Sequence, residues 1–108
     1  MLKSFSVIVP VLNKEAAIVR TLESVEASIQ YFLAHHSGPP VTPEIVVVNE
    51  GSSDRTLERV ETFGQDKPHC KIISHFHRIS AGSARNTGAK IAQGDLLFFC
   101  DGDDLYYP

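Results

Sequence analysis

Three carboxylates lie within four residues near the end of the sequence, at Asp101, Asp103 and Asp104. Carboxylates this close repel one another unless a cation lies among them, and their hard oxygen atoms suit Mg²⁺ or Mn²⁺. Such an ion would also bind the phosphates of a nucleotide. The alternative interpretation is an acidic turn exposed to solvent. The sequence that precedes the carboxylates distinguishes between these two interpretations.

The carboxylates directly follow Leu96–Cys100, an apolar run without polar alternation. This pattern is typical of a strand covered on both faces, as in a parallel sheet. Ligands of open α/β sheets bind at the carboxyl ends of the strands. We therefore expect a buried strand that leads into a metal or ligand site.

Three further strands are predicted upstream, at Phe5–Val9, Ile45–Val48 and Lys71–Ser74, each rich in β-branched or apolar residues. A helix is expected between each pair of consecutive strands. The resulting β-α-β-α-β-α-β order predicts a three-layer α/β/α fold around a mostly parallel sheet with right-handed crossovers. In the strand order 3-2-1-4, the chain reverses direction between strands one and four, and Pro10–Asn13 comes next to Asp101–Asp104.

The helix boundaries follow from capping residues. Asn13 is the predicted N-cap of the first helix, with Glu15 in its first turn. Ser52 or Ser53 is expected to cap the second helix, and Ser80 the third. One apolar face of the first helix recurs at spacings of three and four residues: Ile18, Leu22, Val25, Ile29 and Phe32.

The composition is that of an ordinary globular domain. The chain has 108 residues, which fits one domain over 1–108, and 43% of them are hydrophobic. A net charge of −3 without a basic stripe predicts no nucleic-acid partner. No apolar stretch reaches the length of a membrane span, and no signal peptide is recognised. We expect a cytoplasmic location, with membrane association left open for a longer parent protein.

Several side chains at the predicted strand ends could bind a nucleotide. Glu50 can accept hydrogen bonds from a base N–H or a ribose hydroxyl, and Pro10–Leu12 offers apolar contact for a base. Arg85 has the geometry to pair with phosphate, although a salt bridge on the helix surface is the competing interpretation. No glycine-rich dinucleotide fingerprint, P-loop or nucleophile elbow occurs.

Histidines supply an alternative metal hypothesis. His35 and His36 are adjacent, while His75 and His77 alternate close to Cys70. None of them has the paired spacing of zinc ligands. We expect solvated or loop histidines at both places.

Four stretches in order resemble the family 2 glycosyltransferases with the GT-A fold. Val7–Glu15 is similar to their V-I-V-P-x-Y-N-x-E, and Val46–Asp54 to V-V-D-D-G-S-x-D. Gly82–Gly88 resembles G-x-x-x-A-R-N-x-G with a shorter glycine spacing. Phe98–Asp104, followed by Pro108, resembles F-x-D-x-D-D…P. The resemblance covers essentially the whole chain.

The resemblance implies a site for a nucleotide-diphosphosugar of UDP or GDP type, with Mn²⁺ or Mg²⁺ on the pyrophosphate. The metal would neutralise charge on the departing nucleoside diphosphate. Glu50 would stand where an Asp binds uracil. The implied nucleotide-sugar residues are Pro10, Val11, Leu12, Glu15, Glu50, Arg85, Asp101 and Gly102, and the implied metal ligands are Asp103 and Asp101.

Three features depart from the family pattern. Asn49-Glu50 replaces paired aspartates, so the longer Glu50 side chain is expected to shift base recognition. Leu12 replaces a tyrosine, which removes an aromatic stack on the base. Gln30–Pro43 looks like an insertion.

Family members continue beyond the D-x-D segment into an acceptor-binding part that commonly carries the general base. We therefore expect this base beyond residue 108, and slow or no sugar transfer by the chain alone. The acceptor (saccharide, lipid or protein) and the stereochemistry depend on that further part. The resemblance also implies a role in cell-wall or polysaccharide synthesis.

Two other functions are considered. A non-catalytic nucleotide-binding or assembly module would keep the fold. A sugar nucleotidyltransferase would need a glycine-rich basic loop after the first strand, which is absent. The expected exposed edge after the fourth strand also predicts self-association.

Overall fold

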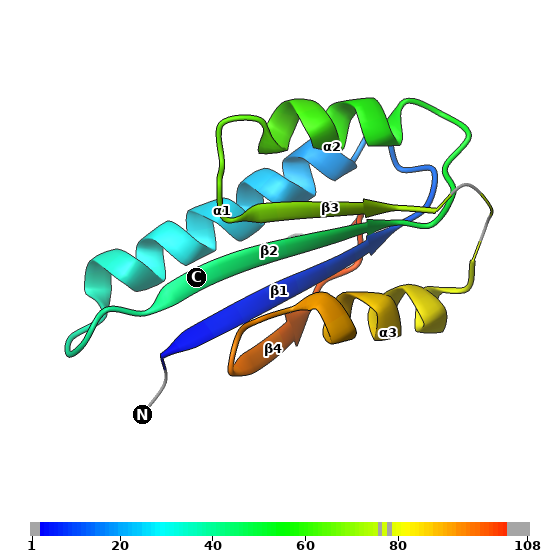
Figure 1. The fold of residues 1–108 in the computed structure, drawn as a ribbon. Coiled ribbons are helices and arrows are strands. Elements are labelled where there is room, and N and C mark those ends of the chain that lie inside the picture. The colour runs from blue at the N-terminus through cyan, green and yellow to red at the C-terminus, as the bar shows by residue number, and fades with distance from the viewer. Residues whose placement is uncertain (1–2, 76, 78, 104–108) are drawn as a thin grey trace.

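The computed structural model describes residues 3–75, 77 and 79–103, in which strands and helices alternate as predicted (Figure 1). The elements are β1 (Ser4–Val11), α1 (Ile18–His35), β2 (Thr42–Asn49), α2 (Thr56–Gly64), β3 (Cys70–Ser74), α3 (Ala81–Ile91) and β4 (Leu96–Phe99). Among these residues, no helix combines the length and apolar character needed to cross a membrane.

The sheet has the order β3-β2-β1-β4, and its paired strands all run parallel. At the centre of the register, Val7 of β1 lies opposite Ile45 of β2 and Phe98 of β4. The predicted strand order is confirmed. Strands β1 and β4 therefore flank the point where the topology reverses, and their carboxyl ends are the expected place for a ligand.

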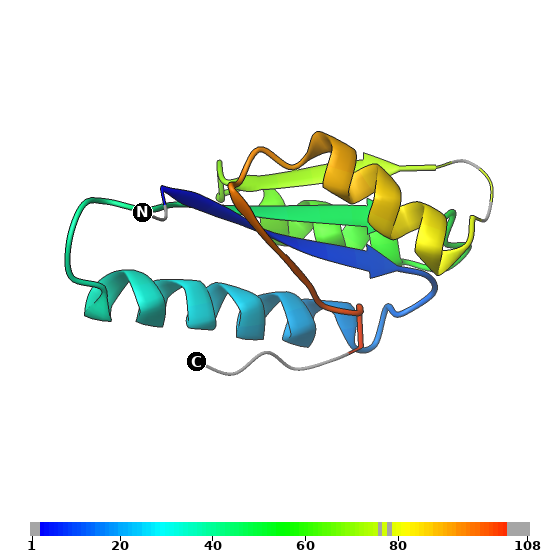
Figure 2. The same ribbon diagram turned by 90° about the horizontal axis from the view of Figure 1, so that it is seen from below.

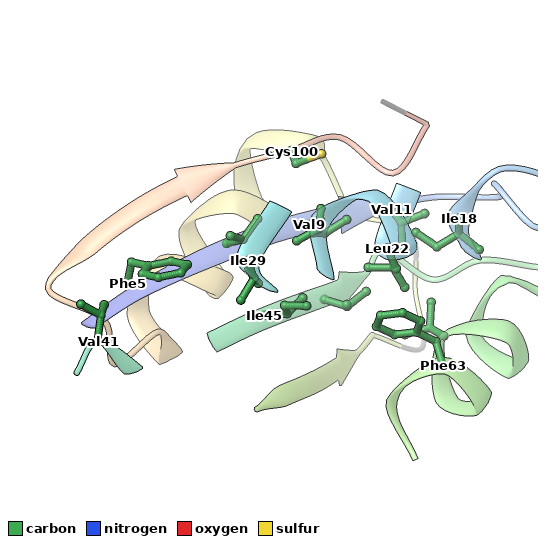
Figure 3. Close-up of a cluster of buried hydrophobic side chains, with 14 residues drawn as sticks. Phe5, Val9, Val11, Ile18, Leu22, Ile29, Val41, Ile45, Phe63 and Cys100 are labelled. Atoms are coloured by element: carbon green, nitrogen blue, oxygen red, sulfur yellow. The ribbon is translucent and has the colours of Figure 1, made fainter. Parts of the chain in front are cut away.

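The two faces of the sheet carry separate cores because successive side chains of β1 point to opposite sides. Val7 and Val9 pack with the predicted apolar face of α1 and with Val60 and Phe63 of α2 (Figure 3). Ile8 belongs to a smaller core under α3. Figure 2 shows α1 and α3 on opposite sides of the sheet, which confirms the α/β/α layers.

Helix α3 lies close to the sheet because its inner face is small. Ala84 is fully buried, and a Cβ on Gly88 would collide with Cγ2 of Ile8. This close approach brings the start of α3, with Arg85, near the carboxyl ends of the central strands. The predicted N-cap is confirmed, since Ser80 Oγ accepts a hydrogen bond from the N–H of Ser83 at 3.1 Å.

The prediction that the last strand is covered on both faces is wrong for the described part of the chain. Leu96, Phe98 and Phe99 are 45%, 39% and 48% exposed. Strand β4 forms the edge of the sheet, where helices packed over the central strands give little cover. Phe98 keeps one aromatic contact, an edge-on packing against Phe5 with ring centroids 6.2 Å apart.

Two predicted caps are also wrong. Helix α1 begins at Ile18, and Asn13 instead adopts a positive φ of 50° and accepts a hydrogen bond from the N–H of Ser53. At α2, the N–H of Thr56 donates to Asp54 Oδ1 at 3.0 Å, so neither Ser52 nor Ser53 serves as the cap. In both cases these polar side chains connect two loops rather than starting a helix.

Candidate functional site

A cavity of about 590 Å³ lies at the carboxyl ends of β1 and β4. It is formed by the β1–α1 connection, the end of β2, the start of α3 and the segment after β4. Its lining residues are Pro10, Val11, Leu12, Asn13, Lys14, Glu50, Ile79, Ser80, Arg85, Asp101, Gly102 and Asp103.

The segment after β4 places two carboxylates at the rim of this cavity. Backbone pairing with β1 continues past the strand, since the N–H of Gly102 donates to the carbonyl of Pro10 at 3.2 Å. Gly102 is buried against Val11, and a Cβ there would lie 2.5 Å from Val11 Cγ2. Only glycine allows this approach, and it fixes Asp101 and Asp103 on either side of the contact.

Both carboxylates face cations from other elements. Arg85 of α3 lies 3.3 Å from Asp101, and Lys14 of the β1–α1 connection lies 3.4 Å from Asp103. The four side chains are between 42% and 52% exposed. Exposed pairs of this kind contribute about 0–1 kcal/mol each, so they connect the walls of the cavity without locking them.

Glu50 lines the cavity and is only 6% exposed. Its N–H donates to the carbonyl of Val11 at 2.9 Å, and its carbonyl accepts from the N–H of Ile79 at 3.3 Å. The backbone of Glu50 therefore connects the end of β1 with the chain that enters α3. This arrangement presents an acidic residue beside the apolar Pro10–Leu12 segment.

A set of hydrogen bonds holds the β1–α1 connection against the β2–α2 connection. The N–H of Asn13 donates to Ser52 Oγ at 3.0 Å, and Asn13 Oδ1 accepts from the N–H of Ser53 at 2.8 Å. One residue later, the N–H of Lys14 donates to Thr56 Oγ1 at 2.9 Å. The backbone that carries Leu12 and Lys14 is thus positioned by the neighbouring loop.

Asp54 completes this contact between the loops. Burial alone would raise the pKa of the Asp54 carboxyl, but hydrogen bonds from the hydroxyl and N–H of Thr56 and from the N–H of Glu15 bring it below its ordinary value. Asp54 is therefore ionised at neutral pH. Glu15 reaches this contact through its N–H, 3.3 Å from Asp54 Oδ2.

Eight of the residues predicted for the site line the cavity: Pro10, Val11, Leu12, Glu50, Arg85, Asp101, Gly102 and Asp103. Glu15 is not among the lining residues, and Asp104 and Pro108 lie outside the described part of the chain. Asn13 lines the cavity as the predicted approach of Pro10–Asn13 to the carboxylates requires, whereas Lys14, Ile79 and Ser80 line it without having been predicted there. For Lys14, its place between the motif residues Asn13 and Glu15 was the available signal.

The donor set suits a metal ion only together with a ligand. Within the described ranges, no group of three or more His, Cys, Asp or Glu side chains could hold a metal ion. Asp101 and Asp103 supply two carboxylates at one cavity, and Mg²⁺ is commonly bound by one or two carboxylates plus substrate phosphates. The residues present therefore fit a divalent ion whose remaining ligands come from a diphosphate.

A second cavity, of about 640 Å³, lies between α1 and α2, away from the strand ends. Two of its charged residues pair with each other at 2.9 Å: Arg55, which precedes α2, and Glu58 in the first turn of α2. None of the four family-like stretches supplies a predicted ligand residue to it. The cavity at the topological reversal is the better candidate, despite its slightly smaller volume.

The described histidines differ in their contacts: His75 Nε2 is buried without a hydrogen-bond partner among the described residues, whereas two others are paired. His69 Nε2 lies 2.7 Å from Glu26 Oε1, and His35 Nδ1 lies 2.8 Å from the carbonyl of Tyr31. Burial raises the pKa of the Cys70 thiol to about 11. Because zinc binds the thiolate, this raised pKa makes the partly buried Cys70 a less favourable zinc ligand.

The fold and this cavity define an open α/β protein with a carboxylate-containing cavity at the point where the strand order reverses. The chain belongs to glycosyl transferase family 2, whose family model matches residues 6–108. The resemblance inferred from the four motifs is thereby confirmed.

Named relatives agree with this family. The chain is 34% identical over 106 residues to the uncharacterized glycosyltransferase EpsJ of Bacillus subtilis, covering 96% of this chain and 27% of EpsJ. It is 36% identical over 101 residues to the poly(ribitol-phosphate) β-N-acetylglucosaminyltransferase TarS of Staphylococcus aureus, covering 93% of this chain and 16% of TarS. The chain thus spans about a quarter or less of these relatives.

Solved structures share the fold. A TarS 1–349 structure in complex with UDP-GlcNAc has a TM-score of 0.75 at 34% identity, covering 94% of this chain and 27% of that one. The mannosyltransferase PcManGT of Pyrobaculum calidifontis, in complex with GDP-Man and Mn²⁺, has a TM-score of 0.77 at 25% identity, covering 94% and 28%. These neighbours are GT-A glycosyltransferases, which confirms the predicted fold class.

Proposed function

We propose that this chain forms the donor-binding part of a glycosyltransferase that moves a sugar from a UDP- or GDP-type donor to an acceptor hydroxyl. The observation that carries the proposal is the cavity at the β1/β4 reversal, which joins apolar Pro10–Leu12 to Glu50, Asp101 and Asp103. Further support comes from neighbours solved with UDP-GlcNAc and with GDP-Man and Mn²⁺.

Each wall of the cavity has a role in this proposal. Pro10, Val11 and Leu12 contact the base, and the Glu50 carboxylate accepts hydrogen bonds from base or ribose. Asp101 and Asp103 hold Mn²⁺ or Mg²⁺, which supplies charge neutralisation for the departing nucleoside diphosphate.

Two further assignments complete the donor site. Arg85 binds the diphosphate with its fork of N–H donors. Glu15, which does not line the cavity, supports the β1–α1 connection through its N–H bond to Asp54 rather than by touching the base.

Acceptor activation is assigned to residues outside this chain. The relatives extend far beyond the matched part, and we expect the general base in that extension. Transfer by the 108 residues alone should be slow or absent, and rapid turnover would contradict this part of the proposal. Roles in cell-wall or polysaccharide synthesis and a cytoplasmic location remain predictions from the sequence.

The non-catalytic nucleotide-binding alternative is not favoured by the family match or by the relatives named as glycosyltransferases. The exposed apolar side chains of the edge strand β4 support the predicted self-association. Sedimentation velocity over a range of protein concentrations tests that association. The nucleotidyltransferase alternative gains no support from the family match.

Calorimetric titration of UDP, GDP and their sugar conjugates, with and without Mn²⁺, tests the donor site. We expect binding to need the metal and to be lost in Asp103→Ala. Asp95→Ala is the matched control, because Asp95 is an exposed carboxylate outside the cavity lining. Nucleotide binding that changes neither with Mn²⁺ nor in Asp103→Ala would contradict the proposal.

A further inference from the structure

Two ion pairs between described lining residues of the cavity each join a candidate metal ligand to a cation. Asp103 faces Lys14 at 3.4 Å, and Asp101 faces Arg85 at 3.3 Å. Two negative charges thus stand against two positive charges, and their sum is zero. In this state, the carboxylates are already neutralised before any metal ion arrives.

These pairs are weak enough to be exchanged. All four side chains are about half exposed, so solvent weakens both pairs. A diphosphate carries more negative charge than one carboxylate and offers several acceptor oxygens, so it attracts an ammonium or guanidinium group more strongly. A diphosphate in the cavity therefore offers Lys14 and Arg85 a better partner than the carboxylates that they hold.

The backbone of Lys14 is fixed while its side chain is free to move. Its N–H is bound to Thr56 Oγ1 at 2.9 Å, and its neighbour Asn13 is bound to Ser52 and Ser53. The side chain is 44% exposed at the cavity rim, on a flexible four-carbon stem. It can turn from Asp103 to a ligand without any rearrangement of the loop.

We propose that Lys14 is a diphosphate-binding residue and that Lys14 and Arg85 exchange partners when the donor binds. Without donor, they hold Asp103 and Asp101; with donor, they turn to the diphosphate and release both carboxylates to the metal ion. This inference rests on the proposed donor-binding function. It makes metal and diphosphate mutually dependent, because each provides the other's opposite charge, and such coupling is reciprocal.

The test measures the coupling directly. Mn²⁺ binding to the 108-residue chain is followed by electron paramagnetic resonance, with and without UDP or GDP, and nucleotide binding is followed by calorimetry. The variants are Lys14→Gln and Arg85→Gln. Lys90→Gln is the control, because it removes the same charge from an exposed position of α3 outside the cavity lining.

We expect Lys14→Gln and Arg85→Gln to bind Mn²⁺ alone severalfold more tightly than the unmodified chain, since a carboxylate is released. The same variants should bind the nucleoside diphosphate with Mn²⁺ about tenfold more weakly. The opposite signs separate partner exchange from simple damage to the site, which would weaken both. Lys90→Gln should change neither affinity.

Two results overturn the inference in distinguishable ways. If the unmodified chain binds UDP or GDP with Mn²⁺ but neither variant binds Mn²⁺ alone more tightly than Lys90→Gln does, partner exchange is wrong and the donor site stands. If the unmodified chain binds neither nucleotide with Mn²⁺, the proposed function fails and the exchange fails with it.

Discussion

The two ends of the sheet hold acidic side chains in opposite ways. At the amino end, Glu44 is 8% exposed and accepts from Ser6 Oγ at 2.6 Å and from the N–H of Gln93 at 2.9 Å. Lys71 Nζ lies 2.6 Å from its second oxygen. At the carboxyl end, Asp101 and Asp103 are about half exposed and face single cations at 3.3 and 3.4 Å.

This difference separates a structural carboxylate from exchangeable ones. Glu44 joins β2 to β1, to β3 and to the α3–β4 turn, and a buried charge is tolerated because several donors satisfy it. Asp101 and Asp103 remain accessible and weakly paired, as the proposed exchange of their partners for a metal ion requires. The contacts of Glu44 therefore stabilise the sheet that positions Asp101 and Asp103 at its other end.

The largest expected effect is loss of stability in Glu44→Ala. The hydroxyl of Ser6 and the N–H of Gln93 would lose their acceptor, and the free energy of unfolding should fall by about 2–3 kcal/mol. Urea denaturation measures the change. Asp103→Asn should alter the free energy of unfolding by less than about 0.5 kcal/mol. Comparable losses in the two variants would contradict the distinction between a structural Glu44 and an exchangeable Asp103.

A smaller loss is expected from Gly102→Ala. The new Cβ would lie 2.5 Å from Val11 Cγ2, which should cost about 1–2 kcal/mol of stability and displace Asp101 and Asp103. Denaturation and titration of UDP with Mn²⁺ should both show the loss. Gly82→Ala is the control, since its Cβ would meet only Ser80 Oγ at 4.0 Å.

If Gly102→Ala keeps both stability and nucleotide affinity, the contact between Gly102 and Val11 does not position the carboxylates. The comparison between the sheet ends would then need another source for the geometry of Asp101 and Asp103.

Acid should destabilise the chain partly by protonating Glu44. We expect this loss of stability to be smaller than the loss in Glu44→Ala. Burial alone would raise the pKa of Glu44, but hydrogen bonds from Lys71, Ser6 and the N–H of Gln93 bring it below the ordinary value of 4.5. A carboxyl with a lowered folded pKa stabilises the fold above its unfolded pKa and loses that contribution as pH falls through the folded pKa. Denaturation below pH 4.5 measures the decline.

Glu44→Gln cannot titrate at this position, so its stability should depend less on pH in that range. An equal slope in Glu44→Gln and in the unmodified chain would show that other carboxylates, such as Asp54, govern the acid response.

Local sequence patterns predicted the parallel strands and the residues that follow their carboxyl ends, because apolar runs define the strands. The order 3-2-1-4 was one of several orders that this pattern allows. Local patterns did not predict the exposure of Phe98 and Phe99, which depends on how far the helices extend over the edge strand. Nor did they predict the role of Asn13, whose contact with Ser53 joins residues forty positions apart.

The Glu44 contacts were missed for the same reason. Its partners Ser6 and Gln93 lie 38 and 49 residues away in the sequence, so no local spacing indicates them. Lys14 was missed as a lining residue because a lysine after Asn13 reads as an ordinary surface charge. Its pairing with Asp103 exists only once β1 and β4 are neighbours.

The smallest expected effect is a gain, in Leu12→Tyr. Leu12 lines the cavity where the family pattern has a tyrosine, and an aromatic ring would stack on the base of a bound nucleotide. UDP with Mn²⁺ should bind about two- to fivefold more tightly, which corresponds to about 0.5–1 kcal/mol. The affinity for Mn²⁺ alone should not change, because Leu12 supplies no ligand to the metal ion in this proposal. If instead Leu12→Tyr weakens UDP while leaving the fold intact, Leu12 does not face the base, and the base belongs elsewhere in the cavity.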